Sequence, residues 1–291
     1  MSKPVVIVDI TAVLFRMYFA KMQHQTPQGL EIGGVWGVVT TLKRIIKEMK
    51  PKYLAAVFDA GMKTFRSDIS ADYKANRGSP PDDLIPQFDL SYQLCQEVGI
   101  SCFRRAGFEA DDLMATIAML AKQQQVPVLM LTVDKDLNQL VDDNFPSIWR
   151  VDFFKKQVFT RTLVKKSMGV YPEQCIDFMA LIGDAVDNIS GVRGIGPKTA
   201  QELLERFASL DNIYENLEVL NEKKWIRVRK LLEEGKEKAY QSKALVTLKK
   251  DIDLSGQLID IQKDLCWSGR DCYSFLQSLG LQRYASDLSP I

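Results

Sequence analysis

The sequence contains one histidine, five cysteines and no long apolar run. The single histidine, His24, lies in a polar stretch that we interpret as a loop, and its isolation excludes most histidine-dependent catalysis and zinc ligation. The cysteines are odd in number and form no Cys-x-x-Cys pair, which favours free thiols in a reducing compartment over disulfides or a zinc site. No run approaches the roughly 20 apolar residues of a membrane span, and Met1 leads directly into a strand-length run, so we expect neither a membrane segment nor a signal peptide.

Neither sign of charge is in excess, because 38 lysines and arginines stand against 37 acidic residues. The net charge of +1 neither favours nor excludes nucleic acid as a partner, since binding depends on where the charges lie. A content of 46% hydrophobic and 26% charged residues is ordinary for a soluble globular protein. The length of 291 residues predicts one large domain, or one domain with a smaller module.

Short runs rich in β-branched residues alternate with longer helical patterns in the first half of the chain. The predicted strands are Val5–Val8, Tyr53–Phe58 and Val126–Thr132, and the predicted helices include Val35–Met49, Pro86–Val98 and Asp111–Gln125. This alternation predicts an α/β fold with a mostly parallel central sheet flanked by helices. Ligands of such sheets bind beyond the carboxyl ends of the strands, where Asp9, Asp59 and Asp134 would converge.

The strand signal fades from about residue 161 onward, and helical patterning replaces it. We therefore predict an α/β body over residues 1–160 and a helical module over residues 161–291. Within the body, residues 61–85 are polar, carry four cations and end in Gly78-Ser79-Pro80-Pro81. A segment of this length between packed elements is more often functional or mobile than a plain surface loop.

Two features mark the predicted helical module. The glycines of the run Gly191–Ala200 indicate a tight connection before an amphipathic stretch, and Pro197 suits a first helical turn. The run from Lys223 to Lys230 holds five cations and no anion. A local excess of positive charge of this kind favours contact with an anionic partner.

Acidic residues gather at the start of one predicted helix and after one predicted strand. Glu109, Asp111 and Asp112 stand where a helix dipole favours acids, but capping explains one or two of them rather than three. Asp136 follows Asp134 at the alternate spacing that points two side chains in one direction as the chain leaves a strand. Both groups are predicted to face the carboxyl edge of the sheet.

A last pair of acids, Asp184 and Asp187, has the i,i+3 spacing that predicts one face of a helix. The chain thus offers nine acids that would converge without matching bases. Two unit charges about 4 Å apart repel by on the order of 4 kcal/mol at an intermediate dielectric constant. Hard cations such as Mg²⁺ or Mn²⁺ relieve that repulsion, and two of them about 3.5–4 Å apart support phosphoryl transfer.

These motifs, in this order, resemble the 5′ nuclease domain of bacterial DNA polymerase I and, more widely, the flap endonuclease family. The landmarks are Asp9 with Phe15-Arg16, Phe58-Asp59-Ala60, Phe65-Arg66, Tyr73-Lys74-x-x-Arg77, Gly107-Phe-Glu-Ala-Asp-Asp112, Thr132-Val-Asp-Lys-Asp136, Gly183-Asp-x-x-Asp-Asn188 and Gly191-Val-Arg-Gly-Ile-Gly-Pro-Lys-Thr-Ala200. The resemblance implies a PIN-like fold. It also implies a structure-specific 5′-3′ exonuclease or flap endonuclease that hydrolyses DNA, and RNA primers, in replication and repair.

The resemblance assigns the acids to two metal ions, Mg²⁺ or Mn²⁺. The first ion would be held, partly through water, by Asp9, Asp59, Glu109, Asp111 and Asp112. The second ion would be served by Asp134, Asp136, Asp184 and Asp187, and Asp134 is expected to be essential for catalysis.

The resemblance also implies how DNA is held near the metals. Residues 61–85 would form a helical arch, through which or beside which the single-stranded 5′ end passes. Lys74 and Arg77 would steer the scissile phosphate and stabilise its charge, while Tyr73 could stack on a base. Arg66 is likewise expected to contact DNA.

A second DNA contact is implied for the helix–hairpin–helix module at about residues 183–206. Its backbone amides, with a monovalent cation such as K⁺, would hold duplex phosphates, and the residues expected to do so are Gly194, Gly196, Lys198 and Thr199. The implied partners are branched or 5′-flap DNA and RNA–DNA primer junctions. We expect a monomer, with no membrane association, in a bacterial-type cytoplasm at the nucleoid.

One departure from the family pattern lies beside the first acid. The family usually has glycine there, whereas this chain has Ile10, whose β-branched side chain could alter the turn. The alternative is a catalytically weak nucleic-acid-binding protein of the same fold, although such a protein would gain nothing from acids facing phosphates. A small-molecule phosphatase built on Asp9 would need an aspartate where Thr11 stands.

Overall fold

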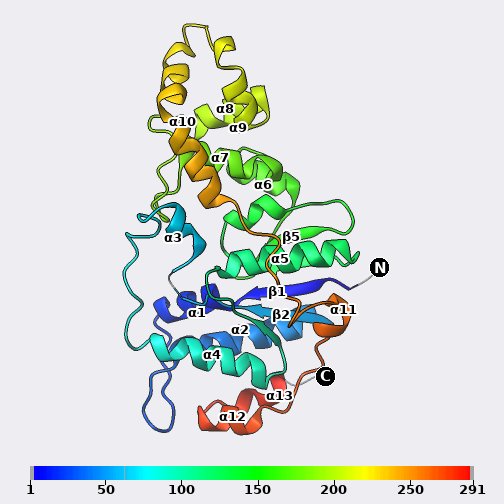
Figure 1. Cartoon of the computed structure of the whole chain (residues 1–291). Coiled ribbons are helices and arrows are strands. Elements are labelled where there is room, and N and C mark those ends of the chain that lie inside the picture. The colour runs from blue at the N-terminus through cyan, green and yellow to red at the C-terminus, as the bar shows by residue number, and fades with distance from the viewer. Residues whose placement is uncertain (1–2, 62, 289–291) are drawn as a thin grey trace.

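A six-stranded sheet forms the centre of the protein, whose computed structural model describes residues 3–61 and 63–288 (Figure 1). Its strands are β1 (Val5–Asp9), β2 (Tyr53–Val57), β3 (Ser101–Phe103), β4 (Val128–Leu131), β5 (Ile148–Asp152) and β6 (Gln157–Phe159), in the order β3-β2-β1-β4-β5-β6. The first five strands are parallel to one another, and β6 pairs with β5 in the antiparallel direction. The predicted α/β fold with a mostly parallel sheet is therefore confirmed.

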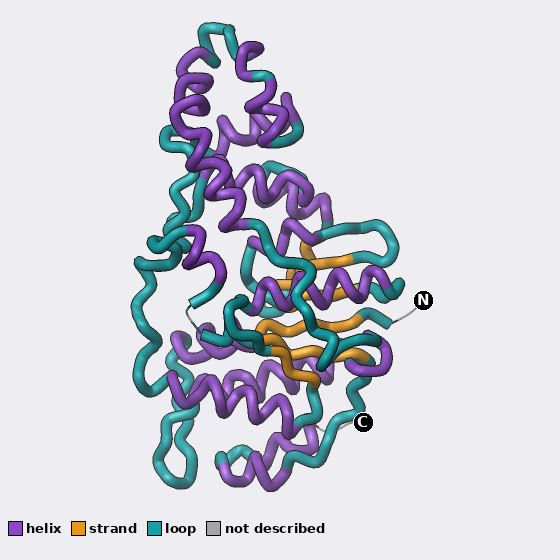
Figure 2. Tube along the Cα trace, viewed as in Figure 1, coloured by secondary structure: helices purple, strands orange, loops and turns teal. Residues whose placement is uncertain are grey.

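Helices cover both faces of the sheet (Figure 2). One face packs against α1 (Ile10–Phe19), α2 (Gly33–Met49) and α4 (Ile85–Glu97), and the other packs against α5 (Ala110–Gln123). Alternate residues of β1 serve the two faces, since Val6 and Val8 lie in the first core and Val5 and Ile7 in the second. Burial on both sides explains why the strands are continuous apolar runs.

A third core builds the helical part of the chain. Its helices are α6 (Arg161–Met168), α7 (Cys175–Ile182), α8 (Pro197–Phe207), α9 (Leu210–Glu215) and the long α10 (Ile226–Val246). Short 3₁₀ helices stand at η1 (Asp136–Leu140), η2 (Pro172–Gln174), η3 (Leu217–Val219) and η4 (Gln282–Tyr284). None of the helices in the described part of the chain has the length and apolar character that crossing a membrane requires.

The chain returns to the α/β body after α10. Residues between 248 and 265 join the core beneath α5, and the Leu54 N–H donates to the Leu265 carbonyl at 2.9 Å. The last helices are α11 (Ile261–Asp264), α12 (Tyr273–Ser278) and α13 (Ala285–Leu288), and α13 packs against α2. There the Trp36 indole N–H donates to the Tyr284 hydroxyl at 2.9 Å. The last part of the predicted helical module thus lies on the body.

The segment from residue 63 to residue 84, here called the arch segment, crosses in front of the carboxyl edge of the sheet (Figure 1). Its one helix among the described residues is the short α3 (Phe65–Ile69), and turns fill most of the rest. The expected helical arch is therefore corrected to an arch that is mostly turns, because Lys74 has a left-handed φ of 55° and prolines interrupt the end. The Lys74 N–H donates to the Asp187 carbonyl at 3.0 Å, which ties this segment to the helical part.

Candidate active site

Asp9, Asp59 and Asp134 lie at the carboxyl ends of three adjacent strands. Asp9 is the last residue of β1, and the other two follow β2 and β4, which flank β1 on either side. Parallel strands with neighbouring registers end at the same edge, so the three carboxylates face one region. The three residues thus lie at one edge of the sheet, as the sequence predicted.

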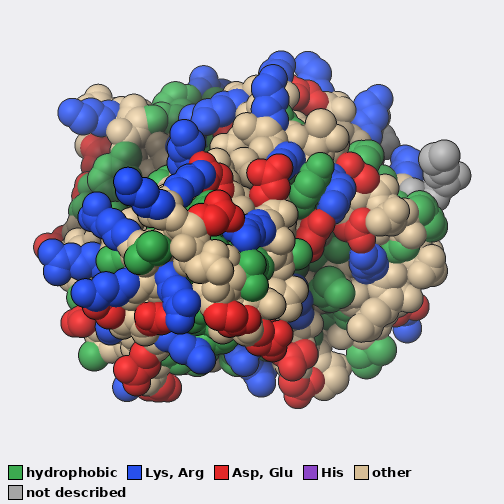
Figure 3. All heavy atoms as spheres, turned by 90° about the horizontal axis from the view of Figure 1, so that it is seen from above, with side chains coloured by type: hydrophobic (Ala, Val, Ile, Leu, Met, Phe, Trp, Pro, Cys, Tyr) green, Lys and Arg blue, Asp and Glu red, His purple; other side chains and the backbone are tan. Residues whose placement is uncertain are grey.

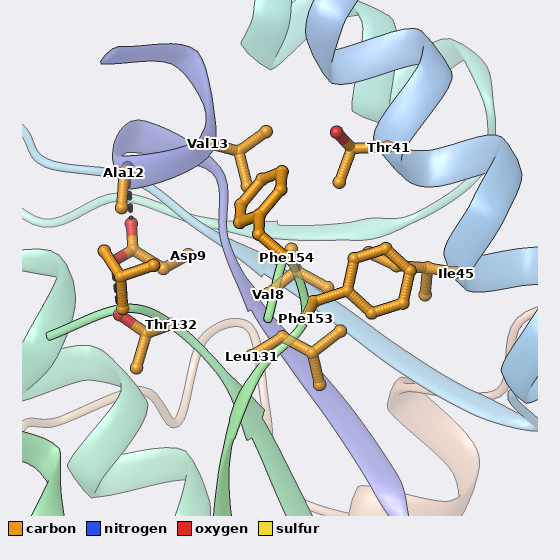
Figure 4. A pocket seen from close by; sticks show the side chains of 11 residues that line it. Val8, Asp9, Ala12, Val13, Thr41, Ile45, Leu131, Thr132, Phe153 and Phe154 are labelled. Carbon is orange, nitrogen blue, oxygen red and sulfur yellow. Dashed lines mark hydrogen bonds between the residues drawn. The ribbon is translucent and has the colours of Figure 1, made fainter. Parts of the chain in front are cut away.

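Asp9 is the most enclosed of the three, with 5% of its surface exposed. Its Oδ1 accepts from the Ala12 N–H at 2.9 Å, which caps α1, and its Oδ2 accepts from the Thr132 hydroxyl at 3.0 Å (Figure 4). Burial, reinforced by the charge of Asp59, raises the pKa of Asp9 to about 7. Both of its hydrogen-bond donors are neutral. No positive charge therefore balances the carboxylate, which is why its pKa stays raised.

The space beside Asp9 in Figure 4 is too small for a ligand. Its volume is about 10 Å³, and its wall is mostly apolar, with Val13, Leu131, Phe153 and Phe154 among the lining residues. A volume of about 10–15 Å³ holds no more than one water molecule. This hollow is therefore a packing gap behind Asp9. It is not the place where a ligand would meet the carboxylate.

Ile10 follows Asp9 directly and is buried in the core. It begins α1, is 1% exposed and lies in the core between α1, α2 and the sheet. The β-branched side chain that departs from the family pattern thus fills the core. Because it is almost fully buried, it does not line the cleft beside the acids.

The amino-terminal end of α5 brings Glu109 and Asp111 to the same edge. Glu109 accepts from the Lys74 ammonium at 2.8 Å and from the Tyr73 hydroxyl at 3.2 Å. Burial, followed by the charges of Asp134 and Asp9, raises the pKa of Asp111 well above its ordinary value. The influence of Asp134 and Asp9 on the pKa of Asp111 indicates that these three carboxylates lie close to one another.

Asp112 and Arg66 occupy positions that differ from their predicted roles. Asp112 is fully buried and accepts two hydrogen bonds from the Arg66 guanidinium, at 2.7 and 2.8 Å, and one from the Lys249 N–H at 2.9 Å. Arg66 itself is 2% exposed. The expected metal ligation by Asp112 and the expected DNA contact by Arg66 are corrected, because each group satisfies the other inside the protein.

Asp134 and Asp136 both follow β4, but the chain between them is not extended as their alternate spacing predicted, because Lys135 has helical backbone angles. The Asp136 N–H donates to Asp134 Oδ1 at 2.8 Å, and Asp136 starts the 3₁₀ helix η1. Burial and the charges of Asp134 and Asp184 raise the pKa of Asp136 to about 8. Its Oδ1 is buried and accepts no hydrogen bond, so this oxygen still lacks a partner.

Asp184 and Asp187 stand on a turn between α7 and α8, which corrects the prediction that they share a helical face. Gly183 has a φ of 75° and ends α7, and the chain then closes a turn through paired bonds of 2.8 Å between Asp184 and Ile189. Asp184 pairs with Lys135 at 2.8 Å, and Asp187 pairs with Arg77. Both acids still join the cluster, through a turn rather than a helix.

Two cations of the arch segment lie directly against the acids. Lys74 contacts Glu109 at 2.8 Å and Asp187 at 3.7 Å, while Arg77 contacts Asp187. Burial lowers the pKa of Lys74, but Glu109 and Asp187 outweigh it, so the pKa is raised overall. Lys74 therefore carries its charge at the centre of the site.

The donor set suits a hard divalent cation. The acids offer only oxygen ligands, and those of Asp9, Asp111, Asp134 and Asp136 have pKa values raised by burial, as expected where a positive charge is missing. Within residues 3–61 and 63–288, however, no three acidic, histidine or cysteine side chains already stand in a metal-holding arrangement. Lys74, Arg77 and Lys135 bind some of the carboxylates instead, and these ion pairs would have to open.

A cleft of about 400 Å³ opens beside the acids. Asp59, Glu109, Lys74 and Arg77 line one part of it, and the lining continues outward through Phe15, Ile85, Phe88, Asp89 and Arg104. The volume is typical of a ligand site, and aromatic rings beside cations are the surface on which single-stranded nucleic acid stacks. Ile85, Phe88 and Arg104 were not predicted, because only the fold brings α4 and the end of β3 to this cleft.

The predicted hairpin lies between α7 and α8, in the segment that follows Asp184 and Asp187. Gly194 has a φ of 89°, Gly196 precedes Pro197 at the start of α8, and Lys198 is exposed in the first turn. Thr199 lies in that turn and is half-buried. Free backbone N–H groups at a helix start favour phosphate oxygens.

Basic side chains gather at the helical end of the molecule. Figure 3 looks down on this end and shows lysine and arginine side chains along the left and upper parts of the view, with acidic ones in the centre and the lower part. The basic run Lys223–Lys230 lies here, at the start of α10. Within the run, Lys224, Arg229 and Lys230 pair with Glu202, Glu233 and Glu234, so the positive charge of this end is local to the run rather than an excess over the whole helical part.

Comparison with known proteins identifies the chain's relatives. A family model for "5′-3′ exonuclease, N-terminal resolvase-like domain" matches residues 4–169, and one for "5′-3′ exonuclease, C-terminal SAM fold" matches residues 170–266. The chain is 33% identical over 267 residues to a 5′-3′ exonuclease from Buchnera aphidicola subsp. Acyrthosiphon pisum, covering 89% of this chain and 91% of that protein. It is 38% identical over 258 residues to DNA polymerase I from Rhizobium leguminosarum, covering 85% of this chain but only 25% of that protein.

Solved structures share the fold over nearly the whole chain. The T5 D15 protein co-crystallised with metal ions superposes with a TM-score of 0.73 at 21% identity, covering 98% of both chains. The catalytic core of Rad2 in complex with a DNA substrate superposes with a TM-score of 0.63 at 18% identity, covering 98% of this chain and 91% of that one. At these identities the likeness concerns the fold.

Proposed function

The chain belongs to the 5′-3′ exonuclease family, and from this premise we propose that it is a structure-specific nuclease that removes unpaired 5′ ends at DNA junctions. The observation that carries the proposal is the cleft of about 400 Å³, which has acids at one end and aromatic and cationic residues along its wall. Duplex DNA would lie on the basic helical end, and the unpaired strand would enter the cleft. Specificity would then follow the shape of the junction rather than its sequence.

Two Mg²⁺ or Mn²⁺ ions would supply the charge that clamps the attacking and leaving oxygens of the phosphodiester. The first would be held by Asp9, Asp59, Glu109 and Asp111, and the second by Asp134, Asp136, Asp184 and Asp187. Asp112 would support the first set through its bond to Arg66. A monovalent cation such as K⁺ would bind the backbone of the hairpin that precedes α8.

Lys74 and Arg77 would change partners when DNA arrives. Their bonds to Glu109 and Asp187 hold them beside the acids, and the scissile phosphate would replace these carboxylates while the acids take up metal. Both cations would then steady the charge that develops on the phosphate, and Tyr73 would support the same turn. The products would be a 5′-phosphate and a 3′-hydroxyl.

The implied substrates are 5′-flap DNA and RNA–DNA primer junctions. Removal of primers and flaps would place the protein in replication and repair, at the bacterial nucleoid and as a monomer. The relatives named above are bacterial, and the match covers only 25% of the Rhizobium leguminosarum polymerase. The proposed role in replication and repair is inferred from the substrate alone.

A 5′-labelled flap DNA tests the proposal. Incubation with Mg²⁺ should release a labelled product cut near the junction, and EDTA should prevent it. Asp134→Asn should abolish cutting while duplex binding remains, because the amide keeps the oxygen that accepts from the Asp136 N–H but loses the charge. Absence of a Mg²⁺-dependent product from the unmodified protein would sink the nuclease proposal, whereas normal cutting by Asp134→Asn would refute the second metal set.

A further inference from the structure

Arg66 joins three parts of the chain that are far apart in sequence. Its guanidinium donates to both oxygens of Asp112, at 2.7 and 2.8 Å, and to the carbonyls of Leu245 and Thr247, at 2.7 and 3.3 Å. Arg66 itself belongs to α3, at the base of the arch segment. With 2% of its surface exposed, it meets neither solvent nor an incoming strand, so its role lies inside the protein.

The two carbonyls belong to the end of α10, which runs from the basic end of the molecule down to α3 (Figure 1). The run Lys223–Lys230 spans the start of α10, which begins at Ile226. Further along, the Ser242 hydroxyl accepts from the Gly191 N–H of the hairpin at 3.2 Å. α10 therefore connects the region proposed to hold duplex DNA with the guanidinium of Arg66.

Asp112 fixes the other side of this junction. It lies in the first turn of α5, where its Oδ2 also accepts from the Glu109 N–H at 3.2 Å. Glu109 and Asp111 extend from the same turn into the acidic cluster. The Arg66 Nη1 also reaches Glu109 Oε2 at 3.4 Å. One guanidinium thus spans from the end of α10 to the acids.

We propose that Arg66 is a positioning residue that sets which phosphodiester is cut, by fixing α10 relative to the acids. The inference rests on the proposed nuclease function. With 21 residues, α10 is about 31 Å long, so a rotation of about 6° at its Arg66 end moves its far end by about 3 Å. Successive phosphates of a strand are about 3.4 Å apart along the duplex axis, so this movement presents the neighbouring phosphodiester.

The planar guanidinium is suited to this task and an ammonium is not. Arginine offers five N–H donors in a rigid fork, and Arg66 directs them at a carboxylate on one side and at two carbonyls on the other. Lysine keeps the charge but has a single flexible donor centre. Arg66→Lys should therefore preserve the buried charge and loosen the angle between α10 and α5.

The test is a single-turnover assay on the 5′-labelled flap, with products separated at single-nucleotide resolution. The unmodified protein should give one dominant product, and Arg66→Lys should raise the fraction cut at neighbouring positions at least about threefold while lowering the rate about 10-fold to 100-fold. A purely structural role would lower the amount of folded protein and leave the position of the cut unchanged. Arg161→Lys is the matched control, because Arg161 also donates twice to a carboxylate, that of Glu173, without joining α10 to the acids.

Asp112→Asn is a second variant, which leaves the bonds from Arg66 to the α10 carbonyls in place. It tests the inference if Arg66→Lys does not fold. It should spread the products in the same way. An unchanged single product, or complete loss of cutting in a folded variant, would overturn the inference. Failure of the unmodified protein to cut at all would instead refute the proposed function, so the two failures are distinguishable in one gel.

Discussion

Lys74 is the side chain whose environment most directly favours contact with a phosphate. Its ammonium lies 2.8 Å from Glu109 and 3.7 Å from Asp187, and its backbone holds a φ of 55° to bring it there. A non-glycine residue in this region is uncommon and costs free energy, so the surrounding contacts must hold it. Those contacts include the N–H bond to the Asp187 carbonyl at 3.0 Å.

Lys74→Ala should lower the single-turnover rate on flap DNA about 100-fold to 1,000-fold, the usual cost of removing one donor that stabilises a developing charge. Affinity for the same DNA should fall by less than about fivefold, because the basic helical end is untouched. Quench-flow rates and fluorescence anisotropy with Ca²⁺ measure the two quantities. Lys21→Ala is the matched control, since Lys21 is exposed and has a φ of 54°. A loss of affinity as large as the loss of rate would make Lys74 a general binding residue.

At the scale of elements, the start of α8 is where we propose that duplex phosphates bind. Lys198 is exposed in its first turn, beside the backbone N–H groups that follow Gly196. Lysine at the start of a helix opposes the helix dipole, which a bound phosphate would compensate. Its placement therefore makes sense as part of an anion site on duplex DNA.

Lys198→Ala should weaken duplex binding to all sequences alike and reduce the slope of log K against log salt by about one. Anisotropy titrations over a range of salt concentrations give this slope. Lys47→Ala, which removes an exposed lysine from α2 on the α/β body, should leave the slope unchanged. An equal change in both variants would show that charge alone, and not the start of α8, determines binding.

The elements differ in how far the sequence could predict them, for physical reasons. The strands β1, β2 and β4 are buried on both faces, so their apolar runs are continuous, whereas β3 and β6 have three residues each and carry too little pattern. The spacing of Asp184 and Asp187 suits both a helix and a turn, and Gly183 decides for the turn. An arginine in a polar segment is usually exposed, but Arg66 is buried by carbonyls about 180 positions further along the chain, at Leu245 and Thr247.

At the scale of the whole molecule, the acidic cluster links stability to pH. Burial raises the pKa of Asp9 to about 7 and that of Asp136 to about 8, whereas both groups have ordinary pKa values near 4 when the chain is unfolded. Between about pH 4 and pH 8 the metal-free native protein therefore binds more protons than the unfolded chain does. Under that condition the free energy of unfolding falls as pH rises.

Divalent metal should reverse this trend, because it binds the deprotonated carboxylates and replaces the protons. In EDTA the melting temperature should be higher at about pH 5.5 than at about pH 8.5, and about 10 mM Mg²⁺ should raise it by about 2 °C or more at the higher pH but less at the lower one. Differential scanning fluorimetry measures all four values. Asp136→Asn should flatten the pH dependence in EDTA, whereas Asp251→Asn, at an exposed position, should not. A melting temperature that rises with pH in EDTA would mean that the acids are already neutralised by Lys74, Arg77 and Lys135, and that the cluster does not require metal to balance its charge.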